Sequence, residues 1–256
     1  MIVVGSTEQG LKERFRILCH NVFWFQGVPF EPEVPGMPDA GVFEDLIAMY
    51  LDLDPYVICL QEIQSHEVFL SLKRALGMEG EYRAGGVLQQ YGGSVLWKSG
   101  TGFGSCDWSD DPPQRMWQQA TVPGSGKLLI CNVHLPSNRQ LGREGSRLRR
   151  IEELGAATLA EPSLVLGDYN EAPGGQVSEF MQSLGYLDAA EMVGRTQKPT
   201  SINGNRGDQI WLHCSAGNRL LGYDVIDIAD MEMGVPGKTY LSDHLPLWID
   251  MEMEEQ

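Results

Sequence analysis

The sequence FRILCHNV, at residues 15–22, sets the pattern from which the rest of the chain can be interpreted. Its β-branched and aromatic residues follow a charged stretch, which is typical of a buried strand. The run contains a polar residue near its end, Asn21, and a Pro/Gly-rich loop follows at residues 26–39, QGVPFEPEVPGMPD. An asparagine near the carboxyl end of a buried strand predicts a polar site at the rim of a sheet.

Three further apolar runs end in the same way. They lead into Glu62 after YVICL (56–60), His134 at the end of the run 127–134, and Asp168 after SLVLG (163–167). A polar group inside such a strand would be costly to bury without a partner. Groups at the strand ends can instead converge, so we expect these three residues and Asn21 to lie together at one rim.

Helices are few and lie between the strand groups. Asp39 can cap one whose apolar residues recur at helical spacing, and a second is expected over 65–76 with Gly77 as its stop. A third is expected near 145–159. Its inward-facing side chains would be Leu148, Ile151 and Leu154.

Strands outnumber these helices. Further ones are expected at 81–84, 94–97, 116–122, 209–213 and 245–251, with an exposed loop over 99–113. This pattern predicts an α/β fold, a four-layer sandwich of two mostly antiparallel sheets flanked by helices. No internal repeat or linker interrupts the chain, so we expect a single domain over residues 1–256.

The composition is that of an ordinary globular protein with an acidic excess. Of the 256 residues, 42% are hydrophobic and 21% are charged, and the formal net charge is −16. Proteins that hold long nucleic acids by nonspecific contacts are usually basic, because lysine and arginine neutralise the phosphates. The acidity therefore favours a compact substrate over a polymer.

The five cysteines are scattered without CxxC spacing, at positions 19, 59, 106, 131 and 214. Neither a zinc site nor a disulfide framework is indicated. The first ten residues, MIVVGSTEQG, lack the basic start and long apolar run of a signal peptide. No stretch approaches the apolar length of a membrane span. We expect a cytoplasmic protein that does not bind membranes, and the sequence leaves its oligomeric state open.

The acidic residues of these motifs suit a hard divalent cation. Mg²⁺ and Mn²⁺ prefer oxygen ligands, and Mg²⁺ usually keeps several waters, so one or two carboxylates are enough. We expect Glu62 to be the first ligand and Asp243, in the sequence SDH, to be the second. The metal would polarise a phosphoryl oxygen and offset the charge that builds on the leaving oxygen.

The sequence GDYN, which ends in Asn170, supplies groups that can activate water. Asp168 and Asn170 are two residues apart, so in an extended segment both would point to the same side. Asp168 could orient or deprotonate water while Asn170 donates to phosphate. His134 could donate to a non-bridging oxygen. His244, with Asp208 as its partner, could do the same or protonate the leaving group.

Each of these residues also has a purely structural interpretation. Asp168 could make only an Asx-type bond to its own backbone, and Glu62 could merely precede the next helix. A lone histidine at a strand end is more often structural than catalytic. The joint occurrence of the motifs, in order and each at the end of an apolar run, favours the catalytic interpretation.

As an ordered set, the motifs resemble those of the endonuclease/exonuclease/phosphatase superfamily. They are ILCHNV, VICLQEI, the VHL strand, GDYN, GDQIWLH and SDHLPL, and they span positions 17 to 247. The resemblance implies a four-layer α/β sandwich and Mg²⁺- or Mn²⁺-dependent in-line attack of water on a phosphoester. The roles that it implies are Glu62 at the metal, Asn21 at metal and phosphate, Asp168 activating water, Asn170 binding phosphate, Asp243 at the metal or orienting its neighbour, and Asp208 paired with His244.

The match to that family's pattern is incomplete in two places. Many relatives carry another phosphate-binding or acid residue between the QE and VHL motifs, and here the candidates are Gln90, Tyr91 and Ser94. Deoxyribonucleases of the pancreatic type have a second histidine–glutamate pair. No such partner for His134 is apparent in this sequence.

Two features bear on the substrate without deciding it. Arg143, Arg147 and Arg150 are spaced four and three apart and would share one helix face. That face could bind phosphates, or it could pair with neighbouring glutamates. The aromatic residues close to Asn21 could stack on bases or pack the loop onto the sheet. They are Phe23, Trp24, Phe25 and Phe30.

We predict a phosphodiesterase or phosphatase that acts on a small or short phosphoester, with nucleotide-derived esters among the candidates. The alternative is an endonuclease or exonuclease that cuts DNA or RNA. A non-catalytic scaffold that retains the fold is the third interpretation, and the complete set of motifs argues against it.

Overall fold

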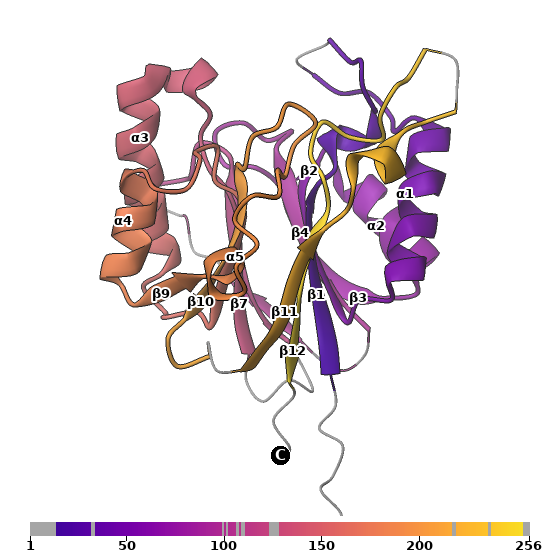
Figure 1. Cartoon of the computed structure of the whole chain (residues 1–256). Helices are drawn as coiled ribbons and strands as arrows, with labels where there is room; N and C mark the ends of the chain where they lie inside the picture. Colours follow the sequence, from indigo (N-terminus) through magenta and orange to yellow (C-terminus); the bar gives the residue numbers. More distant parts are fainter. Residues whose placement is uncertain are drawn as a thin grey trace, which may run out of the picture.

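The structure, a computed structural model, describes residues 14–252 apart from 32–33, 99, 101, 106–107, 109–110, 123–127, 217–218 and 235–236. Two six-stranded sheets pack face to face, and helices cover the outer face of each (Figure 1). This is the predicted four-layer α/β sandwich. The first ten residues and Cys106 lie outside the described part of the chain.

Each sheet has one parallel pair of strands among antiparallel neighbours. The first sheet consists, in spatial order, of β11 (Leu220–Val225), β12 (Leu247–Glu252), β1 (Arg14–Asn21), β2 (Val57–Ile63), β4 (Gly92–Trp97) and β3 (Glu79–Arg83). The second consists of β5 (Phe103–Ser105), β6 (Met116–Val122), β7 (Leu128–His134), β8 (Leu164–Asp168), β10 (Asp208–His213) and β9 (Tyr186–Asp188).

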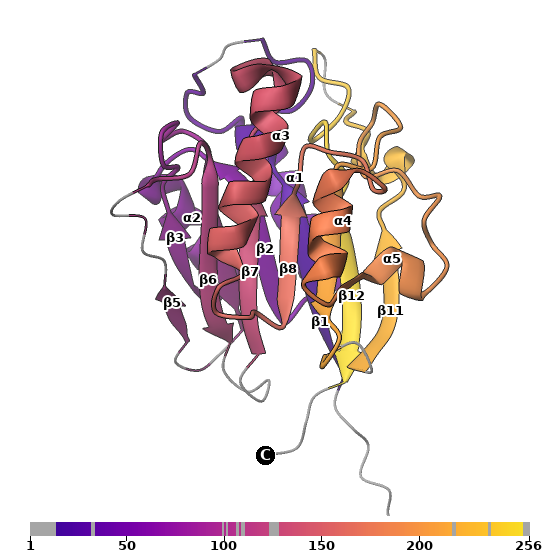
Figure 2. The same cartoon turned by 90° about the vertical axis from the view of Figure 1, so that its left-hand side faces the viewer.

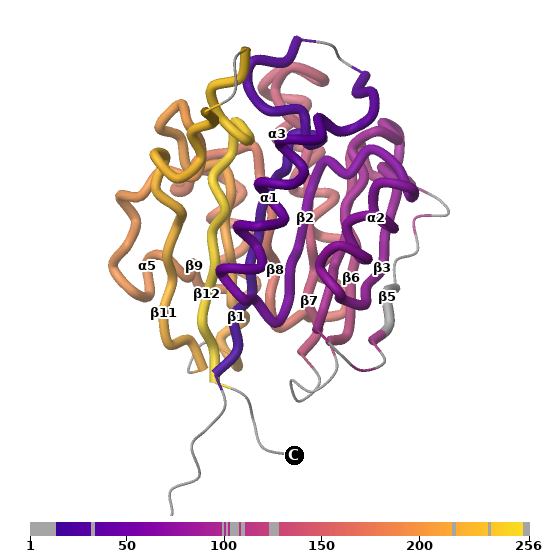
Figure 3. Tube along the Cα trace, turned by 90° about the vertical axis from the view of Figure 1, so that its right-hand side faces the viewer, coloured from indigo at the N-terminus to yellow at the C-terminus, as the bar shows by residue number. Residues whose placement is uncertain are grey.

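The helices are divided between the two outer faces. Helices α3 (Asn138–Ala157) and α4 (Gln176–Ser183) lie over the second sheet, as Figure 2 shows. Helices α1 (Ala40–Leu53) and α2 (His66–Leu76) lie over the first (Figure 3). The short helices are α5 (Ala189–Met192), η1 (Phe23–Phe25) and η3 (Ile228–Met231).

Helices α1 and α2 begin and end where the sequence indicates. Asp39 Oδ1 accepts hydrogen bonds from the first turn of α1 at 3.0 and 3.2 Å, and Ser65 Oγ accepts one from Val68 N at 3.3 Å. These side chains satisfy amides that have no partner within the helix. Gly77 ends α2 with φ +64°, a conformation that glycine adopts without steric cost.

Helix α3 departs from the prediction. It begins at Asn138 rather than near Gly145, with a kink at Gly142, and Leu148, expected to face inward, is 51% exposed. The buried face instead carries Ser146, Arg150, Glu153, Leu154 and Ala157. Three of these residues are polar and hydrogen-bond to neighbouring segments. Apolar spacing alone therefore does not identify the inward face.

Several short elements were not expected from the sequence. The predicted loop over 99–113 contains β5, and β9, β11, α4 and α5 lie in segments where no element was predicted. Strand β11 alternates only weakly between buried and exposed residues, which gives it little sequence signal.

The two parallel pairs bring the polar strand ends to one rim, which is at the top of Figure 1. Asn21 lies opposite Gln61 across β1 and β2, and His134 lies opposite Asp168 across β7 and β8. Strand β10 runs antiparallel to β8, so it begins at the same rim, with Asp208 opposite Asp168. The topology therefore collects residues from distant parts of the sequence.

Gly167→Ala tests how closely β7 and β8 must approach beneath this rim. Gly167 has φ +145°, and a Cβ there would lie 1.8 Å from Val133 O. We expect the free energy of unfolding, measured by urea denaturation, to fall by about 3 kcal/mol or more. The control Gly155→Ala, whose Cβ would meet only Phe180 at 3.8 Å, should gain roughly 0.5–1 kcal/mol from helix propensity. Wild-type stability of Gly167→Ala would contradict this account of the rim.

Candidate active site

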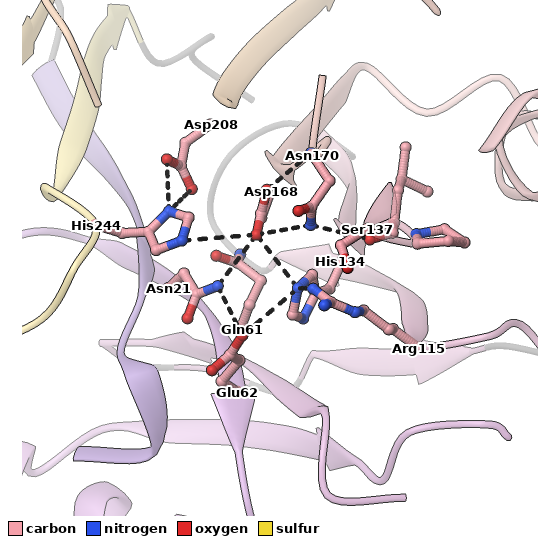
Figure 4. Close-up of polar contacts among 12 residues, drawn as sticks. Asn21, Gln61, Glu62, Arg115, His134, Ser137, Asp168, Asn170, Asp208 and His244 are labelled. Carbon is pink, nitrogen blue, oxygen red and sulfur yellow. Dashed lines mark hydrogen bonds and ion pairs between the residues drawn. The ribbon is translucent and has the colours of Figure 1, made fainter. Parts of the chain in front are cut away.

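The residues predicted to form the site lie together at the rim (Figure 4). Their positions are Asn21 at the end of β1, Glu62 near the end of β2, His134 at the end of β7, Asp168 at the end of β8, Asn170 just beyond it, Asp208 at the start of β10, and Asp243 and His244 before β12. Strands from both sheets therefore contribute to one polar cluster.

Glu62 sits at an irregularity in β2. The register against β4 shifts between Gln61 and Ile63, and Glu62 itself has φ +63°. Such a bulge redirects a side chain. The Glu62 carboxylate accepts a hydrogen bond from Asn21 Nδ2 at 3.2 Å and lies 3.7 Å from His134 Nε2. Left-handed backbone at a non-glycine residue is strained, and strain of this kind is concentrated at functional sites.

Asp168 is the centre of the polar network. Its Oδ2 accepts hydrogen bonds from Asn21 Nδ2 at 3.2 Å and from Asn170 Nδ2 at 3.0 Å, and lies 3.2 Å from His134 Nε2. Burial opposes its charge, but His244, His134 and Arg115 lower the pKa of Asp168 below its ordinary range. The carboxylate is therefore ionised at neutral pH.

Asn170 does not lie in an extended segment, contrary to the expectation from its spacing. Its φ is +51°, so its side chain folds back, and Nδ2 donates to Asp168 Oδ2 and to Leu135 O at 3.1 Å. Its backbone N–H donates to Asp168 Oδ1 at 2.8 Å, which is the Asx-type bond considered above. In this arrangement Asn170 orients Asp168, and both of its side-chain donors are engaged.

His244 forms the predicted pair with Asp208. Its Nδ1 lies 2.9 and 3.1 Å from the two carboxylate oxygens of Asp208, and its Nε2 lies 3.9 Å from Asp168 Oδ2. Burial opposes protonation, but Asp208, Asp243 and Asp168 raise the pKa of His244 well above its ordinary value. The ring is therefore an imidazolium whose Nε2–H lies beside the centre of the site.

His20, which no sequence motif singled out, ties the His244 loop to the first sheet. Its Nε2 bonds to the His244 carbonyl at 3.2 Å and its Nδ1 to the Tyr50 hydroxyl at 2.6 Å. Burial lowers the pKa of His20 to about 3, so the ring is neutral. Because a carbonyl only accepts, Nε2 carries the proton and Nδ1 accepts from Tyr50. Helix α1 thus supports the loop of His244 through one buried ring.

Arg115, directly before β6, is a second residue that sequence reasoning missed. It is 6% exposed, its guanidinium stacks 4.3 Å above the Tyr91 ring, and its Nε donates to Gln140 Oε1 at 3.2 Å. Its Nη1 hydrogen-bonds to His134 Nε2. Strand β6 is antiparallel to β7 and begins at the rim, with Met116 opposite His134. A lone arginine at the start of an apolar strand was the available signal.

His134 has conflicting neighbours. Burial and the positive charge of Arg115 lower its pKa to about 4, so the neutral ring has a single proton. Its Nε2 is close both to the Arg115 guanidinium, which can only donate, and to Asp168 Oδ2, which can only accept. Among the described residues, none hydrogen-bonds to its Nδ1. One ring nitrogen cannot satisfy both neighbours at once.

Two carboxylate oxygens of the site fit a divalent cation. Glu62 Oε2 and Asp243 Oδ1 are buried without a hydrogen-bond partner in the part of the chain that the structure describes, and burial raises the pKa of Glu62 to about 7. Oxygen donors of this kind suit Mg²⁺ or Mn²⁺. Atoms of Asp168, Asp208 and His244 also lie within 4.8 Å of one another. Because Asp208 and His244 already bond to each other, that trio is better suited to moving a proton.

The three candidates between the QE and VHL motifs have different surroundings. Tyr91 packs edge-on against His134 at 5.6 Å between ring centroids and lies under Arg115. Ser94 is fully buried within β4, and Gln90 lines a neighbouring cavity. The positive charge at this side of the rim therefore comes from the Arg115 guanidinium.

The arginine-rich part of α3 is largely paired. Arg147 binds Glu144, and Arg149 binds Asp111 at 2.9 Å. Arg150 is 2% exposed and binds Glu171 at 3.0 Å, so it does not share a solvent face with the other arginines of its predicted stripe. The glutamate-paired interpretation describes these contacts better than a phosphate-binding face.

In the part of the chain that the structure describes, every helix is too short or too polar to cross a lipid bilayer.

Comparison with known proteins gives a family match. The sequence model of the Endonuclease/Exonuclease/phosphatase family matches residues 20–243. A search of curated proteins gives no match.

Solved structures share the fold over nearly the whole chain. The 3′ phosphatase NExo from Neisseria, bound to a product DNA hairpin, aligns with a TM-score of 0.68 and 16% identity over 94% of this chain and 100% of that one. An AP endonuclease from Archaeoglobus fulgidus gives 0.69 and 15% over 92% and 98%. The human Nocturnin catalytic domain with bound sulfate gives 0.62 and 18% over 95% and 96%. At these identities the likeness establishes the fold.

Burial of Glu62 predicts a pH dependence of the metal-free protein's stability. Its folded pKa, about 7, lies above the ordinary 4.5, so stabilisation by protonation is complete below pH 4.5 and lost as the pH rises through 7. Glu62→Gln removes the charge at nearly constant size. In EDTA we expect the variant to match wild type near pH 4.5 and to exceed it by about 1–3 kcal/mol at pH 8 in urea unfolding.

The control for this comparison is Glu44→Gln, an exposed glutamate of α1. Its difference from wild type should not change between the two pH values. A Glu62→Gln difference that is also independent of pH would show that Glu62 is not held in a desolvated environment.

Proposed function

The chain belongs to the endonuclease/exonuclease/phosphatase family and is a phosphoester hydrolase, and we propose that it cleaves a small or short phosphoester with Mg²⁺ or Mn²⁺ and an activated water. The observation that carries this proposal is the ionised Asp168 carboxylate, surrounded by donors and 3.9 Å from the His244 ring. A fixed acceptor and a fixed cationic donor at one point suit in-line attack of water on phosphorus.

In this proposal Asp168 handles the attacking water. Its carboxylate accepts a hydrogen bond from water and takes the proton as the oxygen–phosphorus bond forms. Asn21 and Asn170 hold the carboxylate in position through the 3.2 and 3.0 Å hydrogen bonds to Oδ2. Once phosphate is bound, a donor of Asn170 can move to a phosphoryl oxygen.

His244 acts on the leaving group. Asp208 holds its Nδ1, so the proton on Nε2 is available to a phosphoryl oxygen or to the leaving oxygen. Because Asp208 is buried and already bonded to His244, we assign it to orienting this ring and not to the metal.

Arg115 and His134 bind the phosphate. An oxyanion that accepts from Arg115 would draw the guanidinium away from His134 Nε2, and the ring could then protonate at Nε2 or change tautomer and donate. Substrate binding would thereby resolve the conflict between Arg115 and Asp168 at that nitrogen. Both donors then stabilise charge that develops on the non-bridging oxygens.

Glu62 and Asp243 are the residues that would hold the metal, with Asn21 beside them. Each has an oxygen with no hydrogen bond from a described residue, although Asp243 Oδ1 lies 3.9 Å from His244 Nε2. The Oδ1 of Asn21 retains a lone pair beyond the one that accepts from Phe23 N at 3.1 Å. When bound, Mg²⁺ or Mn²⁺ supplies Lewis-acid polarisation of the phosphoryl group.

A small or short substrate is supported by the charge of the protein. The net charge is −16, and three arginines of α3, Arg147, Arg149 and Arg150, are paired with acidic groups. Two structural neighbours are a 3′ phosphatase bound to a product DNA hairpin and an AP endonuclease, so a nuclease is the alternative. The free thiols of Cys19, Cys59 and Cys214 agree with a reducing cytoplasm as the compartment.

A substrate panel tests this proposal. With Mg²⁺ or Mn²⁺, we expect turnover of nucleotide esters and bis-p-nitrophenyl phosphate and little cleavage of plasmid DNA or single-stranded RNA at physiological salt. Asp168→Asn should lower kcat by at least about 100-fold while leaving the thermal transition in place, because general-base catalysis contributes roughly 10²–10⁴-fold. Steady-state kinetics and thermal unfolding give the two readouts.

The matched control is Asp45→Asn, an exposed aspartate of α1 that should retain wild-type kinetics. Efficient cleavage of the polymers would replace the small-substrate proposal with the nuclease. Wild-type turnover by Asp168→Asn would remove the water-activating role.

The metal assignment is tested by separating Asp243 from Asp208. Asp243→Asn should weaken Mg²⁺ binding by about 10-fold or more, because a ligand is lost. Asp208→Asn should lower kcat with little change in Mg²⁺ affinity, because it acts on His244. Calorimetric titration of Mg²⁺ and measurement of kcat at saturating metal distinguish the two effects. The reverse pattern would assign the metal to Asp208.

A further inference from the structure

A cavity of about 610 Å³ lies next to the active-site rim. Its walls come from the loop before α1, the start of α2, and β3 with the segment after it. They include Met37, Gln64, His66, Tyr82, Gln89 and Gln90. Gln64 follows Glu62 by two residues, so this wall begins within about 7 Å of chain from the carboxylate. The volume falls in the range of roughly 300–1,000 Å³ that is usual for small-molecule sites.

The lining has an unusual chemistry for so acidic a protein. Among the described residues that line the cavity, none is an aspartate, glutamate, lysine or arginine. His66 and Tyr82 contribute rings, which pack with Phe69 at centroid distances of 5.8 Å. Gln89 and Gln90 contribute amides that can both donate and accept, whereas the Gln64 amide already donates to Trp24 O at 3.0 Å and to Gly36 O at 3.3 Å. Val34, Pro35, Met37, Val68 and Ala84 add apolar surface. Such walls suit an uncharged flat ring with a polar edge, and they do not suit a phosphate.

Trp24 fixes the cavity relative to the catalytic residues. Its carbonyl accepts from Gln64 Nε2 at 3.0 Å, and its Nε1 donates to Gln90 O at 2.8 Å. Its ring lies 5.0 Å from the Tyr91 ring, which in turn contacts the His134 ring at 5.6 Å. A continuous set of packed rings and hydrogen bonds therefore connects the cavity walls to the phosphate-binding side of the rim.

The backbone that presents Trp24 is strained. Phe23, Trp24 and Phe25 have φ values of +48°, +51° and +55°, three left-handed residues in succession immediately after the Asn21–Val22 pair. Each such residue costs free energy and persists only where its surroundings impose it. Here the strained turn places one buried tryptophan where it holds Gln64 and the backbone of Gln90 together.

We propose that this cavity binds the nucleobase of a nucleotide-derived phosphoester while the phosphate occupies the rim. The inference deepens the proposed function and rests on it for the position of the phosphate. The rings would stack on the face of the base, and the glutamine amides would bond to its polar edge. A single nucleotide unit fits this arrangement, since the net charge of −16 disfavours a long polyanion.

Three phosphodiesters with p-nitrophenol as the common leaving group test the cavity. Their second alcohol is adenosine, esterified at its 5′ position, benzyl alcohol or methanol, so only this part of the substrate changes. With Mg²⁺ we expect kcat/KM for the adenosine ester to exceed that for the methyl ester by roughly 10-fold or more, the order of one base stack. The benzyl ester should fall between them, because it offers a ring without a polar edge.

His66→Ala and Gln89→Ala should raise KM for the adenosine ester by roughly 5- to 10-fold and leave the methyl ester unchanged. The matched controls are His213→Ala and Gln182→Ala, the same changes at positions outside the cavity lining. Controls should leave all three esters unchanged. Equal effects of the cavity variants on the adenosine and methyl esters would overturn the proposal.

Binding without turnover separates this proposal from the proposed function. In EDTA, adenosine monophosphate should bind roughly 10-fold more tightly than ribose 5-phosphate in an NMR titration, and His66→Ala should remove the difference. If no ester is hydrolysed but this difference holds, the proposed function fails and the base site stands. Equal binding of the two phosphates, or equal kcat/KM for benzyl and adenosine esters, would overturn the base site.

Discussion

The site depends on a carboxylate, Asp168, that is buried and nevertheless ionised. Removing such a charge from water costs several kcal/mol unless the protein supplies partners. Here the partners are Asn21 and Asn170, with His134 and His244 close by. They come from strands of both sheets and from the loop before β12, so Asp168 is solvated by the protein only when all of these segments are in register. Formation of the site is therefore coupled to formation of the whole sandwich.

Several residues around Asp168 differ from it, because some of their polar atoms have no hydrogen bond from a described residue. Glu62 Oε2, Asp243 Oδ1 and His134 Nδ1 are buried without hydrogen bonds, and His134 Nε2 has two neighbours that it cannot satisfy at once. Unmet groups of this kind destabilise a folded protein. These three atoms lie where a cation and a phosphate are proposed to bind, so a ligand there would relieve their share of the destabilisation. Asp168 is held rigidly, and the polar atoms around it are free to bind a ligand. The site is therefore preorganised for charges that arrive with the substrate.

The strand-end residues could be predicted from the sequence because parallel strands run in the same direction. Their last residues therefore lie at the same rim of the sheet. That reasoning recovers Asn21, Glu62, His134 and Asp168, but it overlooks residues that begin antiparallel strands. Arg115 was not predicted for this reason, and Asp208 was predicted only from its motif. The left-handed conformations of Glu62 and Asn170 arise from a bulge and from side-chain bonds across the rim, which no local pattern encodes. Leu148 was assigned to the wrong face because Arg150 and Glu153 are buried through partners distant in the sequence.

The acidity of the chain and the chemistry of its substrate can be reconciled by the placement of positive charge. A net charge of −16 repels polyanions at long range, so attraction for phosphate has to be local. Arg115 and the His244 imidazolium provide it at the rim, whereas Arg147, Arg149 and Arg150 of α3 are held by acidic neighbours. A long phosphate chain would meet repulsion beyond this small positive region, but a single phosphoester would not. Discrimination among single esters then falls to what lies within reach of the rim, and the uncharged cavity beside Glu62 is built from groups that can distinguish one organic substituent from another.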